Sequence, residues 1–276
     1  MSAATQPALA AVVAQFGGLA VAVSGGVDSL TLAAFTHRER RGAVRMYHAV
    51  SPAVPPEATA RTRALAAAED WRLEVIDAGE FADPEYRRNP SNRCFFCKTN
   101  LYGAIAAHTR DQIVSGTNLD DLGEFRPGLD AARAHRVRHP YVEAGIDKRA
   151  VRRLAAALGL GAIADLPAAP CLASRVETGI RIEAPVLALV REAERLVAEA
   201  LGTGGPDTAV RCRVRAGGIA IELDEASLRR LDAALELRLR ELLGDLLQRS
   251  GLARPVRFAP YRAGSAFLRP TEAAGA

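Results

Sequence analysis

The residues with the most direct chemical meaning lie in one short turn, SGGVDS, between an apolar run and a segment of helical character. The adjacent glycines Gly25 and Gly26 allow backbone N–H groups to approach an anion without interference from a Cβ atom. A helix that begins directly after them adds unpaired N–H groups and the positive end of its dipole. The hydroxyl groups of Ser24 and Ser29 can donate hydrogen bonds to the same anion, and Asp28 adds a carboxylate. We therefore predict a phosphate-binding turn, with an ordinary capped strand-to-helix turn as the alternative.

A second glycine turn follows another predicted strand, at residues 112–115. It carries Gly116 and Asn118, and then the adjacent carboxylates Asp120 and Asp121. In open α/β sheets, ligands bind outside the carboxyl ends of the strands, and Mg²⁺ prefers carboxylate oxygens together with phosphate. We predict that Gly116 and Asn118 contact the nucleotide and that the two aspartates hold Mg²⁺. The alternative is a solvated acidic turn in which Asn118 and Asp120 act as caps.

Four cysteines occur in the chain, and Cys94 and Cys97 have the spacing C-x-x-C. A structural zinc site usually takes four ligands, and Cys212 is a poor fourth because it lies within a predicted strand of another domain. A redox dithiol of thioredoxin type would need C-x-x-C directly after a strand and at the start of a helix, whereas a loop rich in Pro and Asn precedes it here. Three thiolates, with Cys171 as the third, can instead hold an iron–sulfur cluster that leaves one iron open. The spacing alone leaves these three alternatives open.

A strand–helix–strand pattern must position these residues. Apolar runs alternate with helical segments at a spacing typical of βαβ units, which form a parallel sheet with helices on both faces. The predicted strands are residues 19–23, 43–50, 72–76 and 112–115, and the predicted helices around them are residues 3–16, 57–70, 99–108 and 147–158, besides the one after the phosphate turn. The polar segment 81–98, which carries Cys94 and Cys97, interrupts this pattern as a predicted functional loop.

The pattern changes near residue 184. The later segments are a long amphipathic helix (183–201), a turn (202–207), two short strands (209–215 and 218–223), a long helix (225–250) and a strand-like stretch (256–268). We therefore predict an α/β fold with two domains. Domain 1–180 has the parallel sheet and carries the phosphate turn and the cysteines Cys94, Cys97 and Cys171. Domain 184–276 is a smaller α+β domain for substrate binding or oligomer contacts.

Composition and charge limit the partners. Net charge is only +4 with a pI of about 9.1, and lysine occurs only at Lys98 and Lys148, so nearly all the 36 basic residues are arginine. This mild excess suits anionic ligands, but with only 5% aromatic residues it does not favour nucleic acid. Because the N-terminus has no basic residue before Arg38 and no apolar run is long enough to span a bilayer, we expect a cytoplasmic protein without a membrane partner.

The order of the motifs resembles that of the LarE-type sulfur transferases, a branch of the PP-loop ATP pyrophosphatase superfamily. The resemblance extends from about Phe16 to Leu268. The motifs that carry it are SGGVDS at Ser24, NPSNRCFFCK at Asn89, SGTNLDDLGEFRPG at Ser115, PCLASR at Pro170, RVR at Arg213 and YRAGS at Tyr261. After PCLASR the chain has Val176-Glu177-Thr178-Gly179, where the family usually has I-P-Y-G.

The resemblance implies an enzyme that acts late in the synthesis of the nickel-pincer nucleotide cofactor. It would use ATP to adenylate a carboxylate of pyridinium-3,5-biscarboxylic acid mononucleotide, release pyrophosphate, and then insert sulfur to give a thiocarboxylate and AMP. Asp28 would be a catalytic as well as a nucleotide-binding residue. The family also implies a homo-oligomer.

The resemblance assigns the sulfur chemistry to the cysteines. Cys171 falls on the position of the sulfur-carrying cysteine, which in single-cysteine members gives up its own sulfur and becomes dehydroalanine. Members with the additional C-x-x-C bind a 4Fe-4S cluster on three cysteines, and its open iron holds hydrosulfide. Cys94, Cys97 and Cys171 match that three-cysteine pattern. The sulfur donor would therefore be hydrosulfide on the cluster, with the protein's own cysteine as the alternative.

Three arginines complete the predicted site. Arg175, four residues after Cys171, is predicted to favour a thiolate or to hold a substrate phosphate, and a surface arginine is the alternative. Arg213 and Arg215 alternate along a predicted strand, so both side chains point to one face, where they can grip a phosphate. A solvated sheet face is the alternative for this pair.

Two other functions fit parts of the pattern. The first is thiolation of tRNA by a PP-loop protein, which predicts a basic face with aromatic residues or an added RNA-binding domain. The second is a nucleotide-binding iron–sulfur sensor without catalysis, which predicts ATP binding without release of pyrophosphate.

Overall fold

Four short apolar strands form a parallel sheet in the computed structural model, which describes residues 5–123, 126–202, 209–252 and 254–268. The strands are β1 (Leu19–Ala22), β2 (Val44–Ala49), β3 (Leu73–Ile76) and β4 (Gln112–Ser115), in the order β3-β2-β1-β4. They are joined through the helices α2 (Val27–Glu39), α3 (Pro56–Ala68), α4 (Pro84–Arg87) and α5 (Arg93–His108). The predicted α/β class with a parallel sheet is confirmed.

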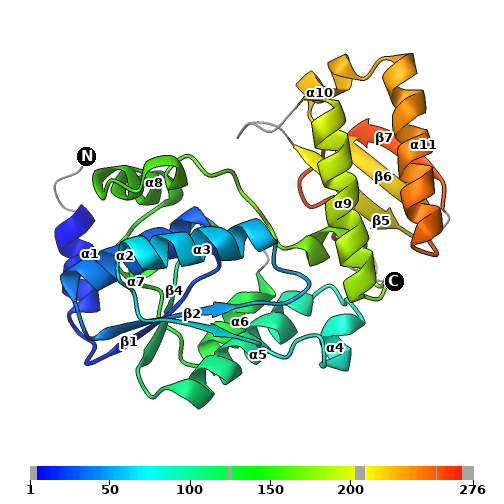
Figure 1. Ribbon diagram of the computed structural model, residues 1–276. Helices are drawn as coiled ribbons and strands as arrows, with labels where there is room; N and C mark the ends of the chain where they lie inside the picture. The colour runs from blue at the N-terminus through cyan, green and yellow to red at the C-terminus, as the bar shows by residue number, and fades with distance from the viewer. Residues whose placement is uncertain (1–4, 124–125, 203–208, 253, 269–276) are drawn as a thin grey trace, which may run out of the picture. The chain divides into compact units, whose positions relative to one another are not determined.

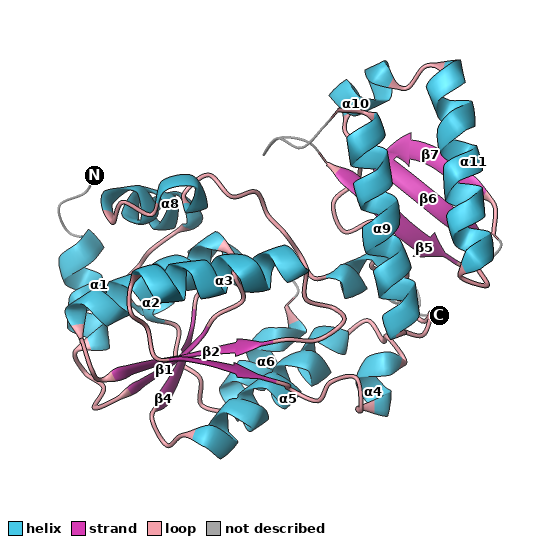
Figure 2. Cartoon of the chain, viewed as in Figure 1, coloured by secondary structure: helices cyan, strands magenta, loops and turns pink. Residues whose placement is uncertain are grey.

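Helices cover both faces of this sheet (Figure 1; Figure 2). The remaining helices of this part are α1 (Thr5–Val13), η1 (Leu119–Gly123), α6 (Pro127–Ala134), α7 (Pro140–Glu143), α8 (Lys148–Ala157) and η2 (Gly161–Ile163). Side chains alternate along β1, so Leu19 and Val21 pack in a core with α1, α2 and α8, whereas Ala20 and Ala22 pack in a second core with α5 and α6. Both faces of β1 are therefore buried.

The strand order creates a switch point between β1 and β4. From β1 the chain runs outward through β2 to β3, and it then returns to the other side of β1 to form β4. Loops that leave the carboxyl ends of such a strand pair diverge to opposite faces of the sheet and leave a crevice for ligands. The two glycine turns predicted from sequence follow these two strands.

The second part of the chain has its own sheet. Contacts between Cα atoms divide the chain into unit 1 (residues 1–83 and 92–169) and unit 2 (residues 84–91 and 170–276). Unit 2 contains η3 (Leu172–Arg175), α9 (Ala184–Ala200), β5 (Val210–Arg215), β6 (Gly218–Leu223), α10 (Glu225–Arg230), α11 (Ala233–Arg249) and β7 (Val256–Pro260). β6 pairs antiparallel with β5 and parallel with β7, and α9 packs on β5 and α11 on β7. The predicted division lies at residues 180–184, whereas the contacts assign residues 170–180 and the segment 84–91 to unit 2.

Asn89 attaches the segment 84–91 to the rest of unit 2. Its side chain is fully buried, and its amide nitrogen donates to the carbonyl oxygens of Val176, Glu177 and Ile180 at 3.3, 2.9 and 2.9 Å. Its own carbonyl accepts from the N–H of Gly179 at 2.9 Å. The backbone at Asn89 has a φ of +56°, which asparagine tolerates better than most residues.

We expect Asn89→Ala to destabilise unit 2 by about 3–5 kcal/mol, because several buried carbonyls lose their donor and alanine is strained at this φ. Asn89→Gly should avoid only the part of this loss in stability that comes from backbone strain, because glycine adopts a positive φ freely. Hydrogen exchange in β6, compared at equal urea concentrations, measures the change. Asn92→Ala is the control, since Asn92 is exposed and its side chain caps no N–H of α5. Equal protection in Asn89→Ala and Asn92→Ala would contradict this role.

The structure corrects three boundaries. The predicted loop 81–98 contains α4, and α5 begins at Arg93, so the cysteine pair is helical. The predicted helix 225–250 is broken, because the Asp232 carboxylate accepts from the N–H of Leu235 and starts a new helix. The predicted strand 256–268 ends at Pro260.

The predicted turn at 202–207 falls mainly on residues outside the described ranges. Among the described helices, none has both the length and the apolar character needed to cross a membrane.

Candidate functional site

The hydroxyl groups of the first glycine turn bond to one another. Ser29 Oγ accepts from the N–H of Ser24 at 3.0 Å and donates to the carbonyl of Gly26 at 3.1 Å. Ser24 Oγ lies 3.1 Å from Ser29 Oγ and must donate to it, because the Ser29 proton is already used. The donors left for an anion are the N–H groups of the first turn of α2, which have no acceptor within the helix.

Residues of α3 and β2 contact this turn and the end of β1. Arg61 Nε donates to the carbonyl of Gly25 at 2.9 Å, and a Cβ atom on Gly25 would lie 2.6 Å from the carbonyl oxygen of Ala58. Since Gly25 also has a φ of +81°, only glycine fits there. The buried His48 ring bonds through Nδ1 to the Val23 carbonyl at 2.8 Å, and burial lowers the pKa of His48. Neutral His48 with its proton on Nδ1 therefore anchors the end of β1.

The second glycine turn lies directly against the first. A Cβ atom on Gly116 would be 2.9 Å from the carbonyl carbon of Asp28 and from the backbone nitrogen of Ser29. Asn118 Nδ2 donates to Asp28 Oδ1 at 3.3 Å. The two turns predicted separately from the sequence thus form one site at the switch point, with Gly25, Gly116 and Asn118 in contact with neighbouring backbone or with Asp28.

Asp28 is the centre of this site, and its main partner was not predicted from the sequence. Lys148 Nζ forms an ion pair with Asp28 Oδ2, and the Tyr141 hydroxyl donates to the Asp28 carbonyl at 3.1 Å. Lys148 is the first residue of α8, and the carboxylate of Asp147 caps that helix by accepting from the N–H of Ala150. The available signal was that Lys148 is one of only two lysines in an arginine-rich chain.

The two acidic residues predicted to hold Mg²⁺ make the contacts of a capped turn. Asp121 Oδ2 accepts from the N–H of Asn118 at 3.0 Å, and Asp121 Oδ1 pairs with Arg126 at 2.8 Å. Asp120 Oδ2 accepts from the N–H of Lys148 at 3.2 Å. These contacts are those of an acidic turn in which each carboxylate accepts a backbone N–H, and the binding of Mg²⁺ by Asp120 and Asp121 stays a prediction.

The cysteine pair lies in the first two turns of α5. Cys94 is exposed and Cys97 is half-buried, and a spacing of three places both thiols on one side of the helix. The pair opens a helix, as thioredoxin-type dithiols do, but it follows α4 and not a strand. Within the described ranges, no three His, Cys, Asp or Glu side chains form a ready-made metal group.

Cys171 lies in unit 2 and is exposed. Arg175, which is buried, holds its loop: Nη1 donates to the carbonyls of Pro170 at 2.6 Å and Cys171 at 3.1 Å. The other guanidinium nitrogens bind Glu194 at 3.0 and 3.2 Å. Arg175 thus contacts the backbone of the cysteine loop, and its donors are occupied by protein groups.

Cys212 has a different environment from Cys171. It is fully buried within β5, and its backbone N–H donates to Glu194 at 3.0 Å. Burial, reinforced by the nearby Glu194 charge, raises the pKa of the Cys212 thiol far above its ordinary value. Cys212 is therefore a neutral core thiol.

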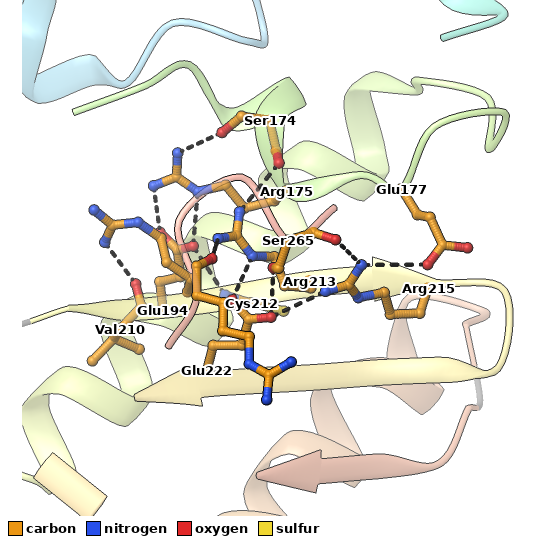
Figure 3. A network of polar contacts seen from close by, with 12 residues as sticks. Ser174, Arg175, Glu177, Glu194, Val210, Cys212, Arg213, Arg215, Glu222 and Ser265 are labelled. Carbon is orange, nitrogen blue, oxygen red and sulfur yellow. Dashed lines mark hydrogen bonds and ion pairs between the residues drawn. The ribbon is translucent and has the colours of Figure 1, made fainter. Parts of the chain in front are cut away.

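Arg213 and Arg215 point to the same face of the sheet, as predicted from their spacing, and share one carboxylate (Figure 3). Arg213 Nε donates to Glu222 Oε2 at 2.9 Å, and Arg215 Nη2 donates to Glu222 Oε1 at 3.0 Å. Ser265 Oγ donates to the same Oε1 at 2.6 Å. Glu222 was not predicted as their partner, because the sequence pattern does not give the register between β5 and β6 that brings Glu222 to this face.

Comparison with known proteins adds relatives but no activity. No family model matches the chain. The chain is 36% identical over 178 residues to the uncharacterized protein slr1717 of Synechocystis sp., and this alignment covers 63% of the chain and 66% of the relative. It is 29% identical over 114 residues to the uncharacterized protein MJ0830 of Methanocaldococcus jannaschii, which covers 40% of this chain and 44% of that relative. The chain thus spans at most 66% of the length of these relatives.

Proposed function

We propose that this chain is an ATP-dependent sulfur transferase of the LarE type within the PP-loop superfamily. It adenylates a carboxylate of a small nucleotide-like substrate, pyridinium-3,5-biscarboxylic acid mononucleotide, and exchanges AMP for sulfur. The observation that supports this most is the convergence of two glycine turns, Asp28 and Lys148 at the switch point of a parallel sheet.

The groups in unit 1 support the first half of the proposed reaction. A carboxylate oxygen of the substrate attacks the α-phosphorus of ATP, and the bond to the β-phosphate oxygen breaks. Negative charge then increases on the departing pyrophosphate. The N–H groups at the start of α2 and the Lys148 ammonium group are fixed donors for that charge, which is how preorganised sites lower such barriers.

The second half replaces AMP by sulfur. Hydrosulfide attacks the acyl carbon, AMP leaves with its bonding electron pair, and the thiocarboxylic acid loses its proton to solvent. Cys94, Cys97 and Cys171 would hold a 4Fe-4S cluster, and when bound it would supply an open iron that keeps hydrosulfide as the nucleophile. In the alternative route the Cys171 thiolate attacks and displaces AMP, and its Cβ–S bond then breaks as Cα loses a proton, which leaves dehydroalanine and the thiocarboxylate.

A matched pair of glycine variants tests the nucleotide site. Gly116→Ala places a Cβ atom 2.9 Å from the backbone of the phosphate turn, whereas a Cβ atom on Gly123 of the same loop meets no atom within 4 Å. We expect Gly116→Ala to reduce substrate-dependent exchange of labelled pyrophosphate into ATP by about 100-fold, because small displacements of reacting groups are costly. Gly123→Ala should remain close to wild type.

Two results would contradict the proposal. One is the same exchange rate in Gly116→Ala and Gly123→Ala. The other is ATP binding by the wild-type protein without any pyrophosphate release in the presence of the mononucleotide, which is the result expected for a sensor.

A further inference from the structure

Arg211 on β5 forms no ion pair with an acidic side chain among the described residues. Arg211, Arg213 and Arg215 alternate along β5 and therefore share a face of the sheet. The register places Glu222 of β6 directly opposite Arg211. Directly opposed side chains on one face are the natural partners in an antiparallel pair, so an Arg211–Glu222 pair would be the simplest arrangement.

The Glu222 carboxylate is used elsewhere. Its two oxygens accept from Arg213, Arg215 and Ser265 at distances between 2.6 and 3.0 Å (Figure 3). Arg213 and Arg215 also donate to backbone carbonyls, of Ser174 at 3.2 Å and Ser265 at 2.6 Å. The donors of these two arginines are thus largely satisfied by the protein itself.

Arg175, the fourth arginine of this region, is satisfied in the same way. Glu194 binds it through both carboxylate oxygens. Among the described residues, Arg211 forms no ion pair, and the hydrogen bond it makes is to its own neighbour, the Val210 carbonyl, at 2.9 Å. Arg211 is therefore a half-buried arginine of this network that no described carboxylate contacts directly.

The surroundings of Arg211 make this state costly. Its side chain is half-buried, and burial together with the charge of Arg175 lowers the pKa of Arg211, although the nearby Glu194 charge acts in the opposite direction. An exposed arginine needs no counter-ion, because water solvates it. A guanidinium that has lost part of its water and forms no direct ion pair carries a desolvation cost that an anionic ligand can offset.

The aromatic ring of Tyr261 lies beside the guanidinium groups of Arg211 and Arg213. The Arg211 guanidinium lies 5.9 Å from the centre of the Tyr261 ring, and that of Arg213 lies 6.0 Å from it. Tyr261 is 38% exposed, so this cation–π group is open to solvent. A guanidinium fork that is held by an aromatic ring and has unused donors suits a phosphate group.

We propose that Arg211, beside Tyr261, binds the phosphate monoester of the nucleotide substrate, and that Arg213 and Arg215 are structural members of the Glu222 network. This proposal rests on the proposed function for the identity of the substrate. It moves the phosphate contact from the two arginines predicted by spacing to the third arginine of the same strand.

The probes are inorganic phosphate and the pair nicotinic acid mononucleotide and its riboside, which differ only in the phosphate. Binding is measured by titration calorimetry for wild type, Arg211→Gln, Arg211→Lys and Arg238→Gln. Arg238 is the matched control because it is an exposed arginine on α11. Hydrogen exchange in β5 verifies that each variant is folded.

We expect wild type to prefer the mononucleotide over the riboside by roughly 10- to 100-fold, the value of a charged hydrogen-bonded contact. Arg211→Gln should remove this preference, Arg211→Lys should keep part of it, and Arg238→Gln should leave it unchanged. Inorganic phosphate should compete with the mononucleotide in every protein except Arg211→Gln.

Preference retained in folded Arg211→Gln would overturn the proposal, and so would a wild-type protein that neither prefers the mononucleotide nor binds inorganic phosphate. The pyrophosphate exchange assay separates this result from failure of the proposed function. Exchange that persists while the Arg211 variants bind normally would refute the phosphate contact alone. Phosphate binding that depends on Arg211 in a protein without exchange would refute the proposed adenylation alone.

Discussion

Replacing Lys148 by alanine is expected to lower pyrophosphate exchange by about 10²- to 10³-fold, the usual effect of removing one fixed donor from a developing oxyanion. The ammonium group is held beside the phosphate turn by its ion pair with Asp28. Its loss removes a positive charge and also leaves the Asp28 carboxylate without its cation. The variant should therefore bind ATP more weakly and also react more slowly once saturated.

The neighbouring residue supplies the control. Arg149 is exposed on the same helix, so Arg149→Ala changes the charge of α8 equally but does not touch Asp28. Steady-state exchange at varied ATP concentration separates binding from rate for both variants. If Lys148→Ala exchanged pyrophosphate at the same rate as Arg149→Ala, Lys148 would have no role in the proposed reaction.

A double variant can distinguish a role of Lys148 in neutralising Asp28 from a direct contact of the Lys148 charge with the nucleotide. If Lys148 acts mainly by neutralising Asp28, then Lys148→Met combined with Asp28→Asn should lose much less than the sum of the two single losses. If each group contacts the nucleotide independently, the losses in free energy should add. Either outcome assigns a role, and the first would make Lys148 a partner of Asp28.

Local patterns explain why much of unit 1 was predictable. The strand that ends at Ala22 and the helix that begins at Val27 follow from an apolar run, two glycines and an apolar segment within a short stretch. The sequence predicts that the turns with Gly116 and Asp28 lie at the same edge of the sheet, because the carboxyl ends of parallel strands meet there. The direct contact between Gly116 and Asp28 could not be predicted, because this rule gives no contacts.

Long-range contacts account for what was missed. Lys148 is 120 positions from Asp28 in sequence, so no spacing rule connects them. The burial of Arg175 depends on Glu194 from α9, and the occupation of Arg213 depends on the register of β6. The start of α5 at Arg93 was not predicted, because the Pro and Asn residues before it indicated a loop. These residues belong to the segment that Asn89 attaches to unit 2.

Replacing Cys171 by serine is expected to reduce sulfur transfer by about 10³-fold or more while pyrophosphate exchange persists, because serine can neither donate sulfur nor ligate iron well. Thiocarboxylate formed from the mononucleotide is measured by mass spectrometry, and exchange is measured in the same samples. Cys212→Ala is the control, since Cys212 is a buried neutral thiol and its loss should leave transfer unchanged.

The two sulfur routes then give opposite results for the cysteine pair. If three thiolates hold a cluster, anaerobic protein should contain about four iron atoms per chain, and Cys94→Ser, Cys97→Ser and Cys171→Ser should each lose both iron and multiple turnover. If Cys171 gives up its own sulfur, Cys94→Ser should complete one turnover, and the peptide with residue 171 should lose the mass of hydrogen sulfide. Sulfur transfer by Cys171→Ser at the wild-type rate would contradict both routes, because each requires a thiol at this position.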